Sequence, residues 1–182
     1  IYPIAFGIVF LAVWQILCTS KVIPEFLMPS PIQILKALVE DFPLLMYHLA
    51  VTLAESLIGL LLGVLLGLIF ALLMDRFIKV YKTFYPFVII SQTIPTIAIA
   101  PLLVLWFGYD LLPKVILIIL VTFFPITIGL LESFKSADKD EINLLKSMGA
   151  SEFDIYKFIK LPSSMGKFFA ALKISASYSV VG

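Results

Sequence analysis

Apolar residues gather into five long runs along this chain, with short polar segments between them. A helix needs about 20 predominantly apolar residues to cross the hydrocarbon core of a bilayer. Helices are the expected element, because lipid offers no hydrogen-bond partner to an open backbone. The pattern therefore predicts an all-α, polytopic transmembrane helical bundle. The five expected spans are Tyr2 to Cys18, about Leu49 to Met74, about Phe84 to Phe107, about Lys114 to Leu131, and from near Phe168 to Gly182.

The segment 22–48 lies between the first two expected spans and has a different pattern. It begins with Pro24, Pro29 and Pro31, which break helices. From Ile32 to Asp41 the apolar positions recur at helical spacing, opposite a polar face. We expect a short amphipathic helix that lies at the membrane interface and does not span.

Composition agrees with a bilayer as the solvent of this protein. Of the 182 residues, 62% are hydrophobic and 14% are charged, whereas soluble domains average about 45–50% and about 25%. A soluble domain of this size could not bury so much apolar surface. Composition therefore disfavours a soluble enzyme, a nucleic-acid binder and a disordered chain.

The counts of cysteine and histidine limit the chemistry. The one cysteine, Cys18, allows no internal disulfide and no cysteine-based metal cluster, and the one histidine, His48, excludes an HExxH site. We expect no metal site and no catalytic residue in this chain.

The distribution of Lys and Arg predicts the orientation. Nine lie in the loops after the second and fourth runs, and three (Lys21, Lys36 and Lys114) lie on the other side. The side with nine is expected to be cytoplasmic. Because the chain starts at Ile1 and stops at Gly182 inside an apolar run, we expect a single transmembrane domain over 1–182 that is truncated at both ends, with a sixth span missing.

Two features of the second run have alternative readings. Gly59, Gly63, Gly67 and Ala71 recur every four residues, a stripe that lets another helix approach closely. It could pack within the subunit or between subunits. Glu55 is the one acid well inside a span, so it either has a paired or pathway role or lies at the interface without one.

The third run is unusual for its prolines and polar residues. Pro86, Pro95 and Pro101 each lack a backbone donor and kink or break a helix. Broken helices with polar residues often line a substrate route, although a structural kink satisfied by neighbouring helices is the alternative. The candidate pathway residues are Glu55, Ser91, Gln92, Thr93, Pro95, Thr96 and Thr122.

Residues 133–167 form a long polar loop with helical patterning. Asp138 and Glu141 have capping-box spacing, and Gly149 is typical of a helix C-terminus. A second helix is expected to start at Ser151 and Asp154, with Phe153, Tyr156 and Ile159 broadly on one side and Ile155 adding to it, and to stop at Pro162. The apolar faces of both helices must pack on the base of the bundle or on a soluble partner.

The end of this loop matches a known signature. Gly149 is followed by nine residues and then by Ile159-Lys160-Leu161-Pro162. This spacing resembles the EAA loop, Glu-Ala-Ala-x3-Gly-x9-Ile-x-Leu-Pro, of the membrane permease subunits of binding-protein-dependent ABC importers. The Glu-Ala-Ala positions hold Asn143, Leu144 and Leu145, so the chain departs from the signature there.

Further segments are similar to the subgroup that imports nitrate, sulfonates, taurine and thiamine precursors. They include Met28-Pro29-Ser30-Pro31, Ile94 to Gly108 and Phe123-Phe124-Pro125-Ile126. The stretches Ser91 to Pro101 and Leu172 to Tyr178 look most similar to permeases for a pyrimidine thiamine precursor.

The resemblance implies a type I ABC importer permease of the bacterial cell membrane. It implies a second permease subunit (a homodimer), two cytoplasmic P-loop ATPases that bind the ATP and Mg, and an extracytoplasmic substrate-binding protein. It also implies that the EAA-like loop docks on the ATPase through Gly149, Ala150, Ser151, Glu152, Phe153, Tyr156, Ile159, Leu161 and Pro162. The chain has no Gly-x4-Gly-Lys-Ser/Thr phosphate loop, which agrees with a transport subunit that binds no cofactor and is not an enzyme.

Three other readings stay open at this stage. An ion-coupled secondary transporter would need ionisable residues at mid-membrane, and Glu55 alone qualifies. An intramembrane hydrolase would need His48 beside a serine such as Ser56, eight residues away. A purely structural membrane subunit is disfavoured by the loop spacing.

Overall fold

The computed structural model describes residues 2–181, apart from the side chains of residues 96, 97 and 181. The described part is helical, as the sequence predicts. The chain divides into two compact units, residues 1–51 and 52–182, which are described separately below.

The first unit contains α1 (Tyr2–Thr19), α2 (Pro31–Glu40) and the start of α3 (Phe42–Arg76). The amphipathic helix expected from residue 32 is α2, and it begins with a capping box between Ser30 and Gln33. Pro31 occupies its first turn, where a missing N–H costs nothing. The capping residues and the apolar spacing that follows them therefore account for the start of this helix.

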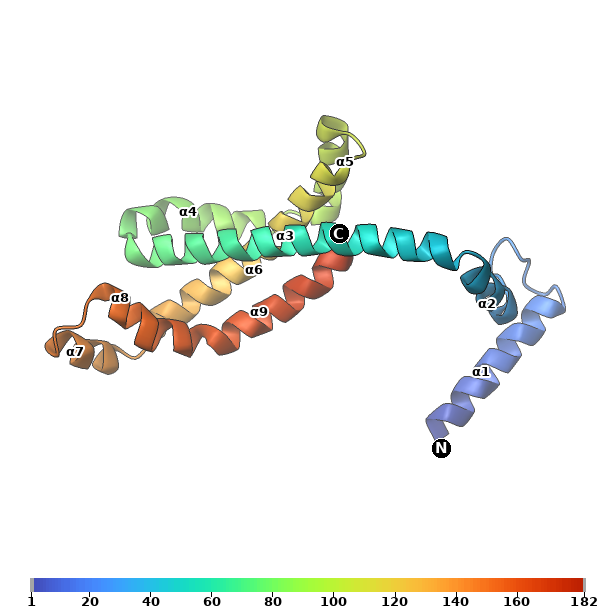
Figure 1. Cartoon of the computed structure of the whole chain (residues 1–182), viewed down its shortest axis with the longest axis horizontal. Coiled ribbons are helices and arrows are strands. Elements are labelled where there is room, and N and C mark those ends of the chain that lie inside the picture. Colours follow the sequence, from blue (N-terminus) through green and yellow to red (C-terminus); the bar gives the residue numbers. More distant parts are fainter. Residues whose placement is uncertain (1, 182) are drawn as a thin grey trace. The chain divides into compact units, whose positions relative to one another are not determined.

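The second unit contains the rest of α3, α4 (Ile78–Ser91), α5 (Thr96–Phe107), α6 (Leu111–Lys135), α7 (Lys139–Ser147), α8 (Glu152–Ile155), the π-helical turn η1 (Tyr156–Lys160) and α9 (Leu161–Val181). Figure 1 shows α7 and α8 at one end of this unit, where α6 ends and α9 begins. The core is formed by α3, α4, α6 and α9, and its buried residues are Ala71, Met74, Val88, Ile126, Leu130, Leu131, Phe134 and Ala171.

The small-residue stripe of α3 packs within the subunit, against α6. A Cβ atom added to Gly59, Gly63 or Gly67 would lie 2.5 Å, 2.7 Å or 2.8 Å from a side-chain carbon of Ile118, Thr122 or Ile126. All four residues of the stripe are buried. Of the two readings of the stripe, contact within the subunit is therefore the one that the structure shows.

The third apolar run is a broken helix. α4 ends at Ser91 and α5 begins after Pro95, whose ring removes a backbone donor. The Ser91 and Thr93 hydroxyls donate to the Val88 and Ile90 carbonyls at 2.9 Å and 2.7 Å, which satisfies groups that the helix end leaves open. The break falls at the middle proline, whereas Pro86 and Pro101 lie inside helices.

Among the described residues, three helices are long and apolar enough to cross a membrane: α1, α3 and α6. α5 contains a shorter apolar stretch, Ala98–Phe107. α9 has 21 residues, begins at Leu161 instead of near Phe168, and buries Ser164, Ser175 and Ser179. The expected count of five spans therefore remains a prediction for the third and fifth runs.

Candidate coupling loop and substrate cleft

The loop between α6 and α9 begins with a short helix whose two ends are both capped. The Asp138 carboxylate accepts a hydrogen bond from the Asp140 amide at 2.8 Å. At the other end Gly149 has φ +83°, a conformation that costs glycine little. The Gly149 and Ala150 amides donate to the Lys146 and Leu145 carbonyls, both at 3.0 Å, which is the Schellman arrangement. The predicted helix, the Asp138 N-cap and the terminal glycine are confirmed, but the capping box with Glu141 does not form, because Asp138 caps the Asp140 amide instead.

A second cap starts the next helix two residues after Gly149. The Ser151 amide and hydroxyl donate to Asp154 Oδ2 at 2.9 Å and 2.6 Å, and the Asp154 amide donates to the Ser151 hydroxyl at 3.3 Å. These hydrogen bonds to Ser151 hold the pKa of the Asp154 carboxyl below its usual value. The direction of the chain is thus fixed between two capped helices by a turn of four residues, 148–151.

The apolar residues of this loop divide into an inward set and an outward set. Ile155 and Ile159 are buried in the bundle, at 2% and 8% exposure. Phe153 is 72% exposed, and Leu144, Met148 and Phe158 are exposed as well. The expectation that Phe153 shares a side with Tyr156 and Ile159 is wrong, because the helix turns the latter two toward the base of the bundle. Phe153 is left as the exposed aromatic residue of the capped turn.

Pro162 does not stop the second helix, in contrast to the expectation. α8, η1 and α9 follow one another without a gap from Glu152 to Val181. Inside η1 the hydrogen bonds widen, and the Leu161 amide donates to the Tyr156 carbonyl, five residues earlier. A proline inside a helix removes one backbone N–H donor, and its ring displaces the carbonyl four residues earlier. The wider hydrogen bonding of a π-helical turn accommodates both effects locally. α8 and η1 therefore lead into α9 as one continuous helical run.

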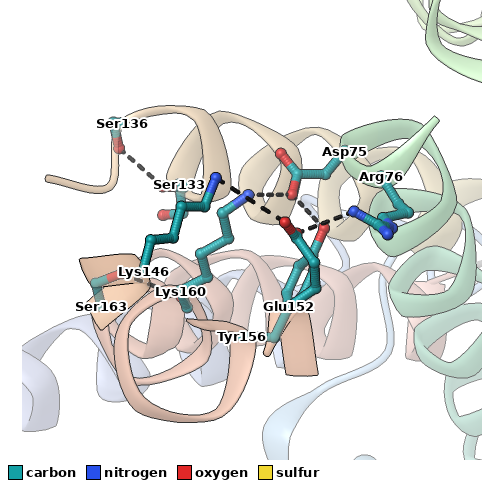
Figure 2. A network of polar contacts seen from close by, with 9 residues as sticks. All are labelled: Asp75, Arg76, Ser133, Ser136, Lys146, Glu152, Tyr156, Lys160 and Ser163. Atoms are coloured by element: carbon teal, nitrogen blue, oxygen red, sulfur yellow. Dashed lines mark hydrogen bonds and ion pairs between the residues drawn. The ribbon is translucent and has the colours of Figure 1, made fainter. Parts of the chain in front are cut away.

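A buried ion pair ties η1 to the end of α3 (Figure 2). Lys160 Nζ lies 2.5 Å from Asp75 Oδ2, and the two side chains are 16% and 6% exposed. The Tyr156 hydroxyl donates to the same oxygen, and its ring packs edge-on against Phe134 at 5.8 Å between centroids. Burial raises the pKa of the Tyr156 phenol, and Asp75 raises it further. The phenol is therefore neutral at physiological pH and acts as a donor.

A second, exposed pair lies beside the buried one in Figure 2. Arg76 Nη1 lies 3.0 Å from Glu152 Oε2, with both side chains about half exposed (50% and 48%). Lys146 Nζ lies 3.9 Å from the other oxygen of Glu152. At the end of α3, Asp75 thus contacts η1 and Arg76 contacts α8.

The break between α4 and α5 opens onto a cleft of about 380 Å³. Ser91 and Gln92 contribute its polar side from the break. None of the seven described residues that line it carries a charge; they are Ser91, Gln92, Ile94, Val121, Phe124, Pro125 and Tyr178. The cleft therefore combines aromatic surface from α6 and α9 with hydroxyl and amide groups.

The remaining pathway candidates do not gather at this cleft. Thr93 is exposed beside it, and Pro95 is exposed at the start of α5. The Thr96 side chain lies outside the described residues. Thr122 is fully buried against Gly63, and its hydroxyl has no partner among the described residues. The structure thus places Thr122 in the contact between α3 and α6 instead of in the cleft.

Glu55 has a specific partner. Lys114 Nζ, at the start of α6, lies 2.9 Å from Glu55 Oε1, and the side chains are 49% and 10% exposed. His48 contacts the neighbouring Tyr47 edge-on at 5.4 Å between centroids. Glu55 is therefore a paired acid at the end of the packed α3–α6 stretch.

Sequence reasoning missed three of the residues that define these sites. Asp75 was overlooked, although an acid in the last turn of a helix opposes the helix dipole and is a signal of a partner. Tyr178 and Phe124 were overlooked as cleft residues because the sequence pattern of their runs does not indicate what an aromatic side chain meets. Only the packing of α9 and α6 brings them to the break between α4 and α5.

Comparison with known proteins covers most of the chain. Residues 63–182 match the family described as binding-protein-dependent transport system inner membrane component. The chain is 37% identical over 182 residues to the formylaminopyrimidine transport permease protein ThiX of Halalkalibacterium halodurans, covering 99% of this chain and 72% of that protein. It is 30% identical over 173 residues to the taurine transport system permease protein TauC of Escherichia coli, covering 91% and 63%.

A solved structure shares the fold. It is described as the crystal structure of an amino acid ABC transporter with histidines, and it matches with a TM-score of 0.59. The match covers 80% of this chain and 75% of that chain at 19% sequence identity. At this identity the likeness concerns the fold alone.

Proposed function

Because this chain belongs to the binding-protein-dependent ABC importer permeases of the inner membrane, we propose that it couples a separate ATPase to uptake of a small heteroaromatic solute. As a permease of this family it is a transport subunit and no enzyme, and nucleotide binding belongs to the partner ATPase. This membership argues against the secondary transporter, hydrolase and purely structural readings of the sequence.

The exposed aromatic side chain of the capped turn carries the coupling part of the proposal. Phe153 is 72% exposed on α8, after a Schellman turn and within the capping box formed by Ser151 and Asp154. An exposed aromatic residue on a rigid support is the usual anchor of a protein interface. Gly149, Ala150, Ser151 and Glu152 form the support, and Leu161 and Pro162 continue it into α9. Tyr156 and Ile159 face the bundle and hold the support in place.

Co-purification tests the docking directly. The full-length permease is expressed with its ATPase and binding protein, purified in mild detergent and analysed for the ATPase-to-permease ratio. Phe153→Asp should lower ATPase retention strongly, since loss of an interface anchor costs about 2 kcal/mol or more, roughly a 30-fold change in Kd. Tyr109→Asp is the control, because Tyr109 is 93% exposed but lies in the loop between α5 and α6. Wild-type retention by Phe153→Asp would refute the docking site.

The uncharged cleft supports a heteroaromatic solute over a sulfonate or a nitrate-like anion. A buried anion needs a cation or several donors to replace its water, and the described lining has no cation. A pyrimidine ring could stack on Tyr178 or Phe124 and exchange hydrogen bonds with Gln92 and Ser91. The binding protein then selects the solute first, and the cleft selects it again.

Transport assays in proteoliposomes separate the two solute classes. Formylaminopyrimidine uptake should exceed taurine uptake in the presence of the cognate binding protein, and Gln92→Ala should lower it several-fold. Thr93→Ala is the control, because Thr93 belongs to the same break but does not line the cleft. Preference for taurine, or equal effects of the two substitutions, would refute this assignment.

The architecture of the complex is also part of the proposal. We infer five spans in this chain, in which α4 and α5 together form the discontinuous third span and α9 forms the fifth. Two copies of the permease would line the route, with a sixth span in the full-length protein. Cross-linking of the full-length permease in native membranes distinguishes a homodimer from a pair of different permeases.

A further inference from the structure

The coupling segment, residues 149–160, is joined to α9 through the chain and to α3 through polar side chains. It continues without a break into α9 through η1 (Figure 1). It reaches α3 through side chains alone, from Lys160 and Tyr156 to Asp75 and from Glu152 to Arg76. A displacement of α8 would therefore pass to α9 through the covalent chain, and to α3 through these polar contacts.

The position of Asp75 is costly for a purely structural role. It is the second-to-last residue of α3, where the negative end of the helix dipole disfavours a carboxylate. A buried ion pair gives little net stability relative to apolar residues of similar volume, because both charges lose their water. The advantage of the ion pair is a defined geometry, because one carboxylate oxygen of Asp75 accepts hydrogen bonds from both Lys160 Nζ and the Tyr156 hydroxyl.

The packing of α3 can carry such a displacement further. Gly59, Gly63 and Gly67 leave no room between α3 and α6. Gly129 of α6 lies close to Ala171 of α9, since an added Cβ would meet the Ala171 Cβ at 3.6 Å. A close-packed group of helices moves as a body and does not deform continuously.

We propose that Asp75 is the positioning residue through which the coupling segment moves α3, and with it the packed group α3–α6. This inference rests on the proposed docking of the loop on an ATPase, and it adds the route by which the motion enters the bundle. The exposed Arg76–Glu152 pair contributes little, because exposed pairs are weak and screened by salt.

The test reads the bundle's response to the ATPase without needing the solute. Full-length permease carrying Cys18→Ser and Gln92→Cys is assembled with its ATPase, and the labelling rate of the cleft cysteine by a maleimide is measured with and without ATP plus vanadate. ATP plus vanadate should change the labelling rate in the otherwise wild-type complex. In the Asp75→Asn complex that change should shrink about tenfold, within the range typical of coupling between sites, while ATPase retention stays at the wild-type level.

Matched variants separate positioning from simple destabilisation. Arg76→Gln, which breaks the exposed pair at the neighbouring residue, should leave the response within about twofold of wild type. Tyr156→Phe keeps the ion pair and loses one hydrogen bond, so it should give an intermediate response even if Asp75→Asn fails to fold. The swap Asp75→Lys/Lys160→Asp should recover part of the response.

Each outcome tests either the docking proposal or the role of Asp75 in transmitting the motion. A wild-type response in Asp75→Asn or in Tyr156→Phe would overturn the role of Asp75 and leave the docking proposal standing. Loss of the ATPase from the complex without any substitution would overturn the docking proposal. A complex that retains its ATPase but shows no response to ATP plus vanadate would overturn the transmission route.

Discussion

Gly63→Ala measures how closely α3 and α6 pack. The new Cβ would lie 2.7 Å from Thr122 Cβ, where ordinary contacts begin at 3.4 Å. The helices must therefore separate locally by 0.7 Å (3.4 minus 2.7). A gap of this order forfeits a quarter to a half of the dispersion energy of the atoms facing it, and the neighbouring contacts at Gly59 and Gly67 open as well.

The expected cost follows from two opposing effects. Overpacking of a close contact costs about 1–3 kcal/mol, and replacing glycine by alanine inside a helix returns about 1 kcal/mol. Because the contact is made by a β-carbon that cannot rotate away, we expect the upper end of the overpacking range and a net loss of about 2 kcal/mol. For a chain of this size that corresponds to a fall in Tm of roughly 4–8 °C.

Thermal unfolding of the purified permease in detergent, followed by far-ultraviolet circular dichroism, provides the measurement. Gly166→Ala is the matched control, because Gly166 is helical and an added Cβ meets nothing within 4 Å. It should leave Tm unchanged or raise it slightly. The packing argument fails if Gly63→Ala raises Tm as Gly166→Ala does.

Three further predictions concern individual polar groups. Thr122→Val should leave transport unchanged and raise the free energy of unfolding by up to about 1 kcal/mol, because it removes a buried hydroxyl without a partner among the described residues. A loss of transport with normal Tm would show instead that Thr122 contacts the solute. Lys114→Met should lower the free energy of unfolding by about 1–2 kcal/mol, less than the figure for a fully buried pair because Lys114 is half exposed. The double variant Glu55→Gln/Lys114→Met should recover most of this loss. Chemical unfolding in mixed micelles would contradict the pairing if the double variant were no more stable than the single one. Because the pKa of Asp154 is depressed, its capping box stabilises the start of α8 above the unfolded pKa near 3.8, and this stabilisation is lost as pH falls below it. Protection of the α8 amides from hydrogen exchange, corrected for intrinsic rates, should therefore fall at pH 3 in the wild type. An equal pH dependence in Ser151→Ala would refute the assignment.

The sequence determined the local structure of this protein because local structure follows from neighbouring residues. Ser30 and Gln33 define the start of α2, Asp138 and Gly149 define the two ends of α7, and Pro95 marks the break between α4 and α5. The spacing from Gly149 to Pro162 was enough to indicate the family, which the comparisons confirm.

Helical periodicity places residues on a face but does not say what the face meets. It grouped Phe153 with Tyr156 and Ile159, yet the π-helical turn and the continuation into α9 leave Phe153 outside and turn Ile159 inward. Pro162 was expected to end a helix because the rule for proline assumes regular α-helical bonding, which η1 does not have.

Contacts between distant segments were decided by the tertiary structure alone. The stripe on α3 predicts a close helix contact, but only the fold shows that α6 is the helix it meets. Asp75 and Lys160 are 85 residues apart, and Glu55 and Lys114 are 59 apart. Such pairs depend on how the helices cross in space, and a single sequence records which residues can pair while the packing of the helices decides which of them do.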